Sequence, residues 1–291
     1  MQPAPDFATR ITALCPGFIA GDRIRARKSD LLAGTLDGTA VIAKRVAKPS
    51  PVWEFYLQHE LAIYRAFAAH PSGIRTPRLV AATHDLLVIE RITGAPLATQ
   101  RRPAARLPIR TIGAILDAHA QLATYAHTPA SQKAPRARLR DRLLEDPTDP
   151  GWVRDGIRLC GKRGTIDAEL AREIDQVLAT SPATFQHGDL LLRNIISDDE
   201  DDLVLVDWEC AGMHPRDWDL ALVWTQLAGP ARTLVEDAVR ESTTRWRAFL
   251  GLVIFAFARE LRFVDAFPSP NAATRDGIAA ELADTARRFR E

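Results

Sequence analysis

The chain has 291 residues, a net charge of +1, 46% hydrophobic residues and 26% charged residues. These values are ordinary for a globular protein, and they allow one large domain or two smaller domains with proper cores. A net charge this close to zero creates no global field that would recruit nucleic acid or an anionic membrane, so we expect neither as a partner.

The first 92 residues predict a small sheet that follows a short helix. We expect the helix within residues 1–20, ending near Pro16-Gly17, since this pair is typical of a helix end. Strands are predicted at 24–28 and 31–46. The turn signal Leu36-Asp37-Gly38 divides the second run into the two arms of a hairpin.

One longer helix lies inside this sheet region. Apolar residues recur at helical spacing over 54–69, with Glu60 beside their stripe. Before it, the alternating and branched run Val41–Val46 places Lys44 on a strand. Two more strands are expected at 79–82 and 86–92. The order β-β-β-α-β-β indicates one sheet with one helix.

Beyond residue 92 the pattern becomes mostly helical. Residues 93–96 are predicted to be a linker, and dense proline and charge from about 129 to 164 indicate loops and short helices. Two short strands are expected within 190–209, around the acidic turn 198–202. Helices are predicted over 109–125, over 168–179 and over most of 235–267. The predicted class is α+β, with an N-terminal lobe at 1–92 and a larger, mostly helical lobe at 93–291.

The residues that indicate chemistry follow Phe185. The segment from His187 to Asn194 reads His-Gly-Asp-Leu-Leu-Leu-Arg-Asn, and an apolar strand then ends at Asp207. Transfer of a phosphoryl group needs a carboxylate that accepts the proton of the attacking hydroxyl, and Asp189 can supply it. Asn194 and Asp207 offer the hard oxygen ligands that Mg²⁺ prefers. The alternative is that Asp189 and Asn194 only occupy a polar loop and that Asp207 caps a turn.

This block resembles the catalytic and metal-binding segments of the aminoglycoside phosphotransferase family. That family is similar in fold to choline kinases and, more distantly, to protein kinases. The resemblance extends from about residue 24 to about residue 226. It implies a two-lobed protein-kinase-like fold, Mg²⁺ as cofactor, ATP or GTP as phosphate donor and a small-molecule hydroxyl acceptor.

The resemblance also requires a strand lysine paired with a helix glutamate. Lys44 fits the lysine that holds the α- and β-phosphates, and Glu60 fits the glutamate that positions it. Glu54 is a rival for that role, one and a half helical turns earlier. A solvated strand lysine and a surface carboxylate are the alternative interpretation.

Other nucleotide contacts implied by the resemblance involve the backbone. Glu90 and Ile92, in the strand that leads to the second lobe, are expected to bind the base edge, which does not separate ATP from GTP. The loop over the phosphates should be residues 27–30. It departs from the glycine-rich loop of protein kinases because it has no glycine, so Ser29 is expected to contact phosphate through its hydroxyl or through backbone amides.

Three further residues surround the expected catalytic loop. Arg193 is a candidate for neutralising charge on the transferred phosphate, with an ordinary surface arginine as the alternative. His187 is expected to orient the loop by hydrogen bonding. Asp219, in a segment that resembles the one following the family's metal-binding Asp, is expected to brace the loop.

The predicted function is phosphorylation of a small hydroxyl compound, first of all an antibiotic. The apolar segment 249–263 has charges of mixed sign, which favours a nucleoside-like or peptide-like acceptor over a polycationic aminoglycoside. The alternatives are an amino-alcohol or sugar kinase and a catalytically inactive nucleotide-binding relative. A protein kinase is disfavoured, because about ten residues between Asp207 and the next helices leave no room for an activation loop.

The number and spacing of the cysteines indicate in which cellular compartment the protein is expected. Cys15, Cys160 and Cys210 are odd in number and far apart, which supports neither a disulfide framework nor a zinc site. With no signal peptide expected, we predict a reducing, cytoplasmic location. A monomer or a dimer is equally compatible with the sequence.

Overall fold

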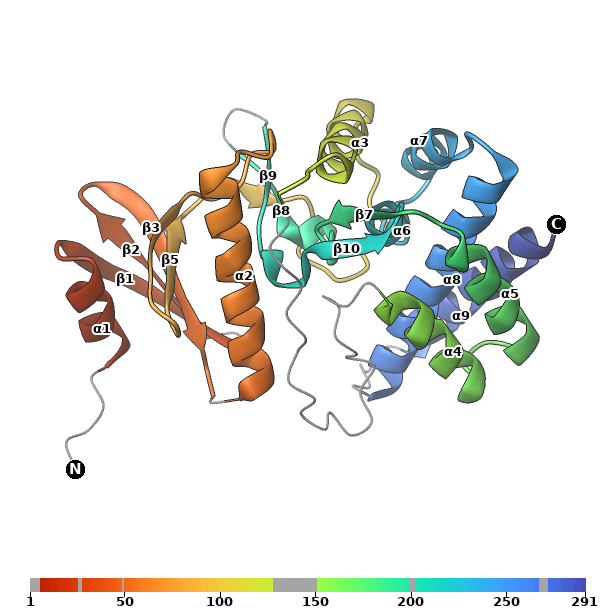
Figure 1. Ribbon diagram of the computed structural model, residues 1–291, viewed down its shortest axis with the longest axis horizontal. Helices are drawn as coiled ribbons and strands as arrows, with labels where there is room; N and C mark the ends of the chain where they lie inside the picture. The colour runs from red at the N-terminus through yellow and green to blue at the C-terminus, as the bar shows by residue number, and fades with distance from the viewer. Residues whose placement is uncertain (1–5, 26–27, 49, 128–150, 199–201, 267–271) are drawn as a thin grey trace. The chain divides into compact units, whose positions relative to one another are not determined.

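The residues that the computed structural model describes are 6–25, 28–48, 50–127, 151–198, 202–266 and 272–291 (Figure 1). They form two compact units. The first comes mainly from Met1–Leu97 and Asn194–Cys210, and the second from Ala98–Ala126, Leu139–Arg193 and Ala211–Glu291. The functional division of the chain at residue 92 stays a proposal. No helix in the described part of the chain is long and apolar enough to span a membrane.

The first unit contains a five-stranded antiparallel sheet and two helices. In spatial order the strands are β1 (Phe18–Arg25), β2 (Ser29–Leu36), β3 (Thr39–Val46), β5 (Leu87–Glu90) and β4 (Leu79–Ala82). Helix α1 (Phe7–Leu14) precedes the sheet and α2 (Pro51–Ala69) connects β3 to β4, which confirms the predicted order.

The first helix ends close to the predicted point, whereas the first strand begins earlier than predicted. Helix α1 ends at Leu14, near the expected Pro16-Gly17, and β1 begins at Phe18 and not at Ile24. Gly17 explains the difference because its φ of +94° turns the chain between the two elements.

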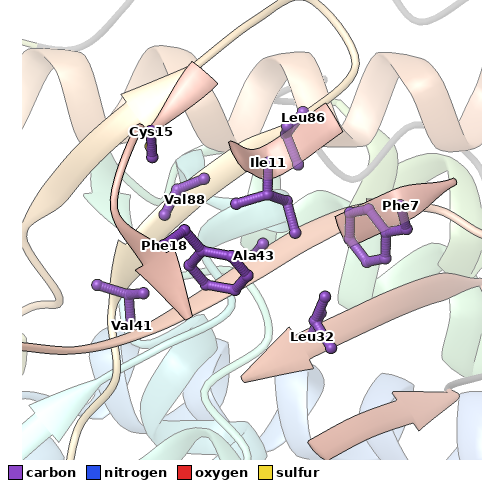
Figure 2. Close-up of a cluster of buried hydrophobic side chains, with 9 residues drawn as sticks. All are labelled: Phe7, Ile11, Cys15, Phe18, Leu32, Val41, Ala43, Leu86 and Val88. Atoms are coloured by element: carbon purple, nitrogen blue, oxygen red, sulfur yellow. The ribbon is translucent and has the colours of Figure 1, made fainter. Parts of the chain in front are cut away.

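Side-chain alternation along the sheet decides where Lys44 points. Val41 and Ala43 lie in a core that α1 covers, together with Phe7, Ile11, Cys15, Phe18, Leu32, Leu86 and Val88 (Figure 2). Because successive side chains of a strand face opposite sides, Ile42 and Lys44 lie on the other face of the sheet. The alternation along β3 therefore places Lys44 on the sheet face opposite the α1 core.

A second, three-stranded sheet in the first unit corrects the predicted linker. Strand β6 (Ala95–Pro96) pairs with β8 (Ile195–Ser197), which pairs in turn with β9 (Leu203–Leu205). Gly94 permits this pairing, because its φ is +131° and an added Cβ would collide with the Ser197 carbonyl. The two strands predicted around the acidic turn are confirmed, while residues 199–201 of that turn lie outside the described residues.

The second unit is mostly helical. The described helices are α3 (Ile109–Ala123), α4 (Trp152–Lys162), α5 (Ala168–Ala179), α6 (Trp218–Trp224), α7 (Pro230–Val239), α8 (Thr243–Ala266) and α9 (Ala272–Arg290). A two-stranded sheet of β7 (Ala183–Gln186) and β10 (Gly212–Pro215), absent from the sequence prediction, supports the segment that follows β7. Most of the range 129–164, predicted as loops and short helices, lies outside the described residues, and the short helix α4 occupies its described end.

A buried histidine makes this unit sensitive to acid. Burial lowers the pKa of His119, on α3, to about 4, and the charges of Arg245 and Arg216 act in the same direction. The opposing Asp217 carboxylate has an oxygen 4.0 Å from Nε2. The folded protein keeps this imidazole neutral where the unfolded chain binds a proton. Its contribution to stability is therefore complete above the ordinary pKa of about 6.5 and is lost as the pH falls toward 4.

We expect His119→Gln to remove this part of the acid sensitivity. Between pH 7 and pH 4.5, the free energy of unfolding of the unchanged protein should fall by about 2–3 kcal/mol more than that of the variant. Urea denaturation at both pH values measures the difference. His84→Gln is the matched control because the His84 side chain is 89% exposed. Parallel pH dependence of His119→Gln and the unchanged protein would contradict the expectation.

Candidate active site

A buried ion pair joins β3 to α2. The Nζ atom of Lys44 lies 2.6 Å from Oε2 of Glu60, and the side chains are 11% and 2% exposed. The rival Glu54, in the first turn of α2, is exposed. Burying a charge without a partner is costly, so each of these two side chains can stay buried and charged only because the other is beside it. The pairing predicted from the resemblance is therefore present.

Asp207 joins the same cluster from the end of β9. Its Oδ1 lies 2.7 Å from Lys44 Nζ. Its backbone has a φ of +67°, a conformation uncommon for residues other than glycine and one that marks functional sites. The carbonyl of Asn194 accepts a hydrogen bond from Val206 N at 3.0 Å. This bond brings Asn194 beside the segment that carries Asp207.

Two further charged residues of this cluster were not predicted as site residues, although one of them, Lys28, lies within the phosphate loop expected at 27–30. Lys28, in the bend before β2, forms an ion pair with Glu209, and its Nζ lies 3.9 Å from Oδ2 of Asp207. Oε2 of Glu209 lies 3.7 Å from Lys44 Nζ. The available signal was the position of Glu209, two residues after Asp207, on a 3₁₀ turn that packs against α2.

The cluster has one more negative than positive side chain, and burial together with this imbalance shifts the pKa values of its members. Burial raises the pKa of Glu60 to about 7, against the attraction of Lys44, while Asp207 and Glu209 repel further negative charge. Burial also raises the pKa of Glu209. Burial alone would lower the pKa of Lys44, but the carboxylates of Asp207, Glu60 and Glu209 raise it well above its ordinary value. The ammonium therefore stays charged.

The donor atoms present fit a hard divalent cation. Carboxylate oxygens of Glu60, Asp207 and Glu209 all lie within 4.8 Å of one another. Oxygen ligands and a negative surplus are what Mg²⁺ requires, with bound phosphates completing its octahedron. Asp207 is the most exposed of the three, at 28% of its side chain, so it is the best placed to meet a nucleotide-bound ion.

A cavity of about 370 Å³ in the first unit adjoins this cluster. It brings together six of the nine residues predicted from the sequence for nucleotide, metal and catalysis: Ser29, Lys44, Glu60, Glu90, Ile92 and Asp207. Its apolar lining includes Ile42 and Ile89, from the sheet face opposite the α1 core. A mostly apolar cavity with a few charged groups at one side suits a flat base that carries phosphates.

One backbone group of the strand that was expected to bind the base already has a hydrogen-bond partner. The backbone N–H of Glu90 already donates to the Arg78 carbonyl, at 2.9 Å. That donor is therefore not available to a base edge. The expected contacts narrow to the Glu90 carbonyl and the backbone of Ile92.

The expected phosphate loop at 27–30 is only partly a loop. Residues 26–27 lie outside the described residues, while Ser29 and Asp30 already belong to β2. Asp30 is held by Arg23 at 2.8 Å and Arg45 at 3.1 Å. Ser29 is buried and lines the cavity, so its side chain can contact a phosphate there.

The segment after β7 carries Asp189 and is held rigidly within the second unit. Asp219, on α6, accepts hydrogen bonds from the backbone N–H groups of His187 at 2.7 Å and of Gly188 at 2.9 Å. His187 Nδ1 accepts one from Asp189 N at 3.3 Å, and Trp218 donates to the Gly188 carbonyl at 3.0 Å. The expected bracing by Asp219 and orientation by His187 are confirmed.

Two guanidinium groups face the two oxygens of the Asp189 carboxylate. Arg193 Nη2 lies 3.6 Å from Oδ2, and Arg259 Nη2, from α8, lies 3.5 Å from Oδ1. The carboxylate is only 13% exposed. Arg193 was predicted at this site, whereas Arg259 was missed because it is 70 positions away in sequence and follows an apolar run.

The apolar segment offered as an acceptor surface is part of the core. Phe249, Phe255 and Phe257 are almost completely buried, and each contributes about 1.5–3 kcal/mol of hydrophobic free energy by staying there. They therefore cannot line an acceptor site, and this argument for a flat acceptor is wrong. The last turns of α8 supply a different argument about the acceptor, because they place the Arg259 guanidinium group beside the Asp189 carboxylate.

The chain matches a family model described as the phosphotransferase enzyme family over residues 32–252. The match covers most of the chain and includes both the Lys44–Glu60 pair and the block from Asp189 to Asp207. No curated protein matches the sequence.

Solved structures with the same fold include three that are 12–17% identical to this chain. The GDP and kanamycin complex of APH(2″)-IIIa has a TM-score of 0.60, with 98% of each chain covered. The macrolide 2′-phosphotransferase of Brachybacterium faecium has 17% identity, a TM-score of 0.56 and 91% coverage of each chain. The choline kinase of Streptococcus pneumoniae has a TM-score of 0.59, with 96% of this chain and 97% of that chain covered. These likenesses confirm the predicted α+β, protein-kinase-like fold.

Proposed function

The chain belongs to the phosphotransferase enzyme family, and from this premise we propose that it transfers the γ-phosphoryl group of a nucleoside triphosphate to a hydroxyl of a small molecule. The hydroxyl oxygen forms a bond to the γ-phosphorus, and the bond from that phosphorus to the oxygen bridging it to the β-phosphate breaks. The hydroxyl proton passes to Asp189. The products are a phosphate ester and a nucleoside diphosphate.

One observation supports the proposal most strongly. Lys44, Glu60 and Asp207 come from three separate segments of the chain and meet through contacts of 2.6 Å and 2.7 Å at the edge of one cavity. The Lys44 ammonium group lies between two carboxylates. It can bind phosphate oxygens once one of these carboxylates, that of Asp207, binds a metal cation instead. A purely structural ion pair has no need of the third charge or of an adjacent cavity.

The proposed roles follow from these positions. Lys44 binds the α- and β-phosphates, and Glu60 keeps it in place. The base occupies the apolar part of the cavity beside Glu90 and Ile92, and Ser29 contacts a phosphate. Asp207 and Asn194 would hold Mg²⁺, which when bound neutralises phosphate charge. ATP and GTP are both proposed as donors, since the base contacts involve backbone groups.

The acceptor that we propose first is an antibiotic of nucleoside or peptide type, not a polycationic aminoglycoside. The support is the pair of guanidinium groups at Asp189, which disfavours an ammonium group on the acceptor. We also propose a cytoplasmic location, since Cys15, Cys160 and Cys210 form no disulfide bond.

A panel assay of nucleotide consumption tests the proposed function. The protein is incubated with MgATP or MgGTP and with nucleoside and peptide antibiotics, kanamycin, choline, homoserine and simple sugars. Transfer of labelled γ-phosphate to an acceptor is the expected result. Binding of nucleotide without transfer to any hydroxyl compound would indicate an inactive relative instead.

Lys44→Met should lower kcat/KM by about 10–10²-fold, because the phosphates lose the cation that positions them. Steady-state kinetics with varied MgATP measures the effect. The control is Lys48→Met, which removes an exposed lysine just beyond β3. Equal kcat/KM in Lys44→Met and Lys48→Met would remove Lys44 from the proposed role.

A further inference from the structure

Charged groups of both signs surround Asp189 within the second unit. Besides Arg193 and Arg259, the guanidinium group of Arg101 acts on Asp189 electrostatically. Arg101 is itself paired with Glu260 through hydrogen bonds of 2.7 Å and 2.6 Å. Three arginines and three carboxylates thus interact here, since the buried Asp219 also feels the charge of Asp189. The two groups directly beside the oxygens of Asp189 are the guanidinium groups of Arg193 and Arg259.

Arg259 is held in place by more than its ion pair. Its guanidinium carbon lies 5.7 Å from the centre of the Trp152 ring. Trp152 is itself buried, and its indole N–H donates to Nδ1 of His214 at 3.1 Å. The Arg259 side chain is 19% exposed. The Arg259 guanidinium group is therefore held in a fixed position and remains partly accessible to a ligand that binds beside Asp189.

Arg259 also lies outside the part of the chain that the family pattern describes. The family match ends at residue 252, whereas Arg259 lies in the last third of α8. The family match therefore does not account for Arg259.

These positions limit the chemistry of the acceptor. Its reacting hydroxyl must come within hydrogen-bonding distance of Asp189, so its neighbouring groups come close to Arg259 and Arg193. An ammonium group there would be repelled by two guanidinium groups. A carboxylate or phosphate group would be bound by charge-assisted, bidentate hydrogen bonds.

We propose that Arg259 is an acceptor-binding residue and that the acceptor carries an anionic group, a carboxylate or a phosphate, close to the hydroxyl that is phosphorylated. This inference rests on the proposed phosphotransferase function. It names a residue that determines specificity for the acceptor, and it states the sign of the charge that the acceptor carries.

The test uses matched acceptors that differ in charge. The probes are glycerate and glycerol 3-phosphate against glycerol, uridine 5′-monophosphate against uridine, and ethanolamine and kanamycin as cations. We expect the best acceptors to be anionic, and the carboxylate and phosphate probes show which anion is preferred. A neutral or cationic best acceptor, or transfer to none of the anionic probes by a protein that binds MgATP, would overturn the inference. Failure to bind MgATP in calorimetry would instead overturn the proposed function.

Three substitutions of Arg259 and one control variant separate acceptor binding from other roles. Arg259→Gln should raise KM for the anionic acceptor at least tenfold and change kcat by less than threefold, and Arg259→Lys should recover part of the loss. Arg247→Gln is the control, since it removes an arginine elsewhere on α8. Arg259→Glu should shift the preference toward cationic acceptors. An equal fall of kcat for all acceptors in Arg259→Gln would contradict acceptor binding, because it would show that Arg259 acts only through Asp189.

Discussion

Asp189→Asn should lower kcat by about 10²–10⁴-fold, which is the usual contribution of a positioned general base. The substitution keeps the shape of the side chain and removes the basic oxygen that accepts the hydroxyl proton. Nucleotide affinity should change little, because the side chains that line the nucleotide cavity come from the first unit.

Single-turnover kinetics and calorimetry with MgATP measure these two quantities separately. Asp155→Asn is the matched control, because Asp155 is an exposed carboxylate on α4 of the same unit. A turnover number of Asp189→Asn within threefold of the unchanged protein would remove Asp189 from the role of proton acceptor.

Asp207→Asn should weaken nucleotide binding in the presence of magnesium by about 10²-fold and abolish the difference between binding with and without the ion. The variant has one carboxylate fewer for the cation, so the phosphates keep more of their charge. Asparagine is a sharper choice than alanine because the φ of +67° at this position is tolerated by asparagine. Loss of binding then reports on the carboxylate and not on backbone strain.

The chain offers a close control for this substitution. Asp37 has a φ of +50° and lies exposed in the turn between β2 and β3, away from the cavity lining. Asp37→Asn therefore makes the same chemical change in a similar backbone conformation and should leave binding unaltered. Calorimetry with ATP in magnesium and in EDTA compares the two variants. Binding by Asp207→Asn that still depends on magnesium would count against Asp207 as a ligand.

Local patterns predicted most of the elements that carry the candidate site. Strand β3 was predicted because branched residues alternate with others, and α2 because its apolar residues repeat at helical spacing. The strands around the acidic turn were predicted in the same way. The short interval from Asp207 to α6, which begins at Trp218, likewise agrees with the argument against a protein kinase. Two of the errors, the start of the first strand and the linker at 93–96, fall at Gly17 and Gly94, where single glycines with positive φ redirect the chain.

The sequence by itself determined which residues are candidates for chemistry and on which elements most of them lie. Order and spacing indicated Asp189, Asn194 and Asp207, and the resemblance added Lys44 and Glu60. These predictions were available because a strand ending in Asp, or a loop with His-Gly-Asp, is a local pattern. Their catalytic and metal-binding roles stay proposals that the substitutions above test.

Only the tertiary structure decided which charges surround these residues and which side chains are free to bind a ligand. Arg259 and Lys28 reach their partners across 70 and 181 positions of sequence, and no local periodicity encodes such pairs. The same holds for the aromatic residues of α8, since burial depends on what other helices pack against them. The net charge around a site and the exposure of its side chains depend on segments that are distant in sequence. They are therefore defined only when folding brings those segments together.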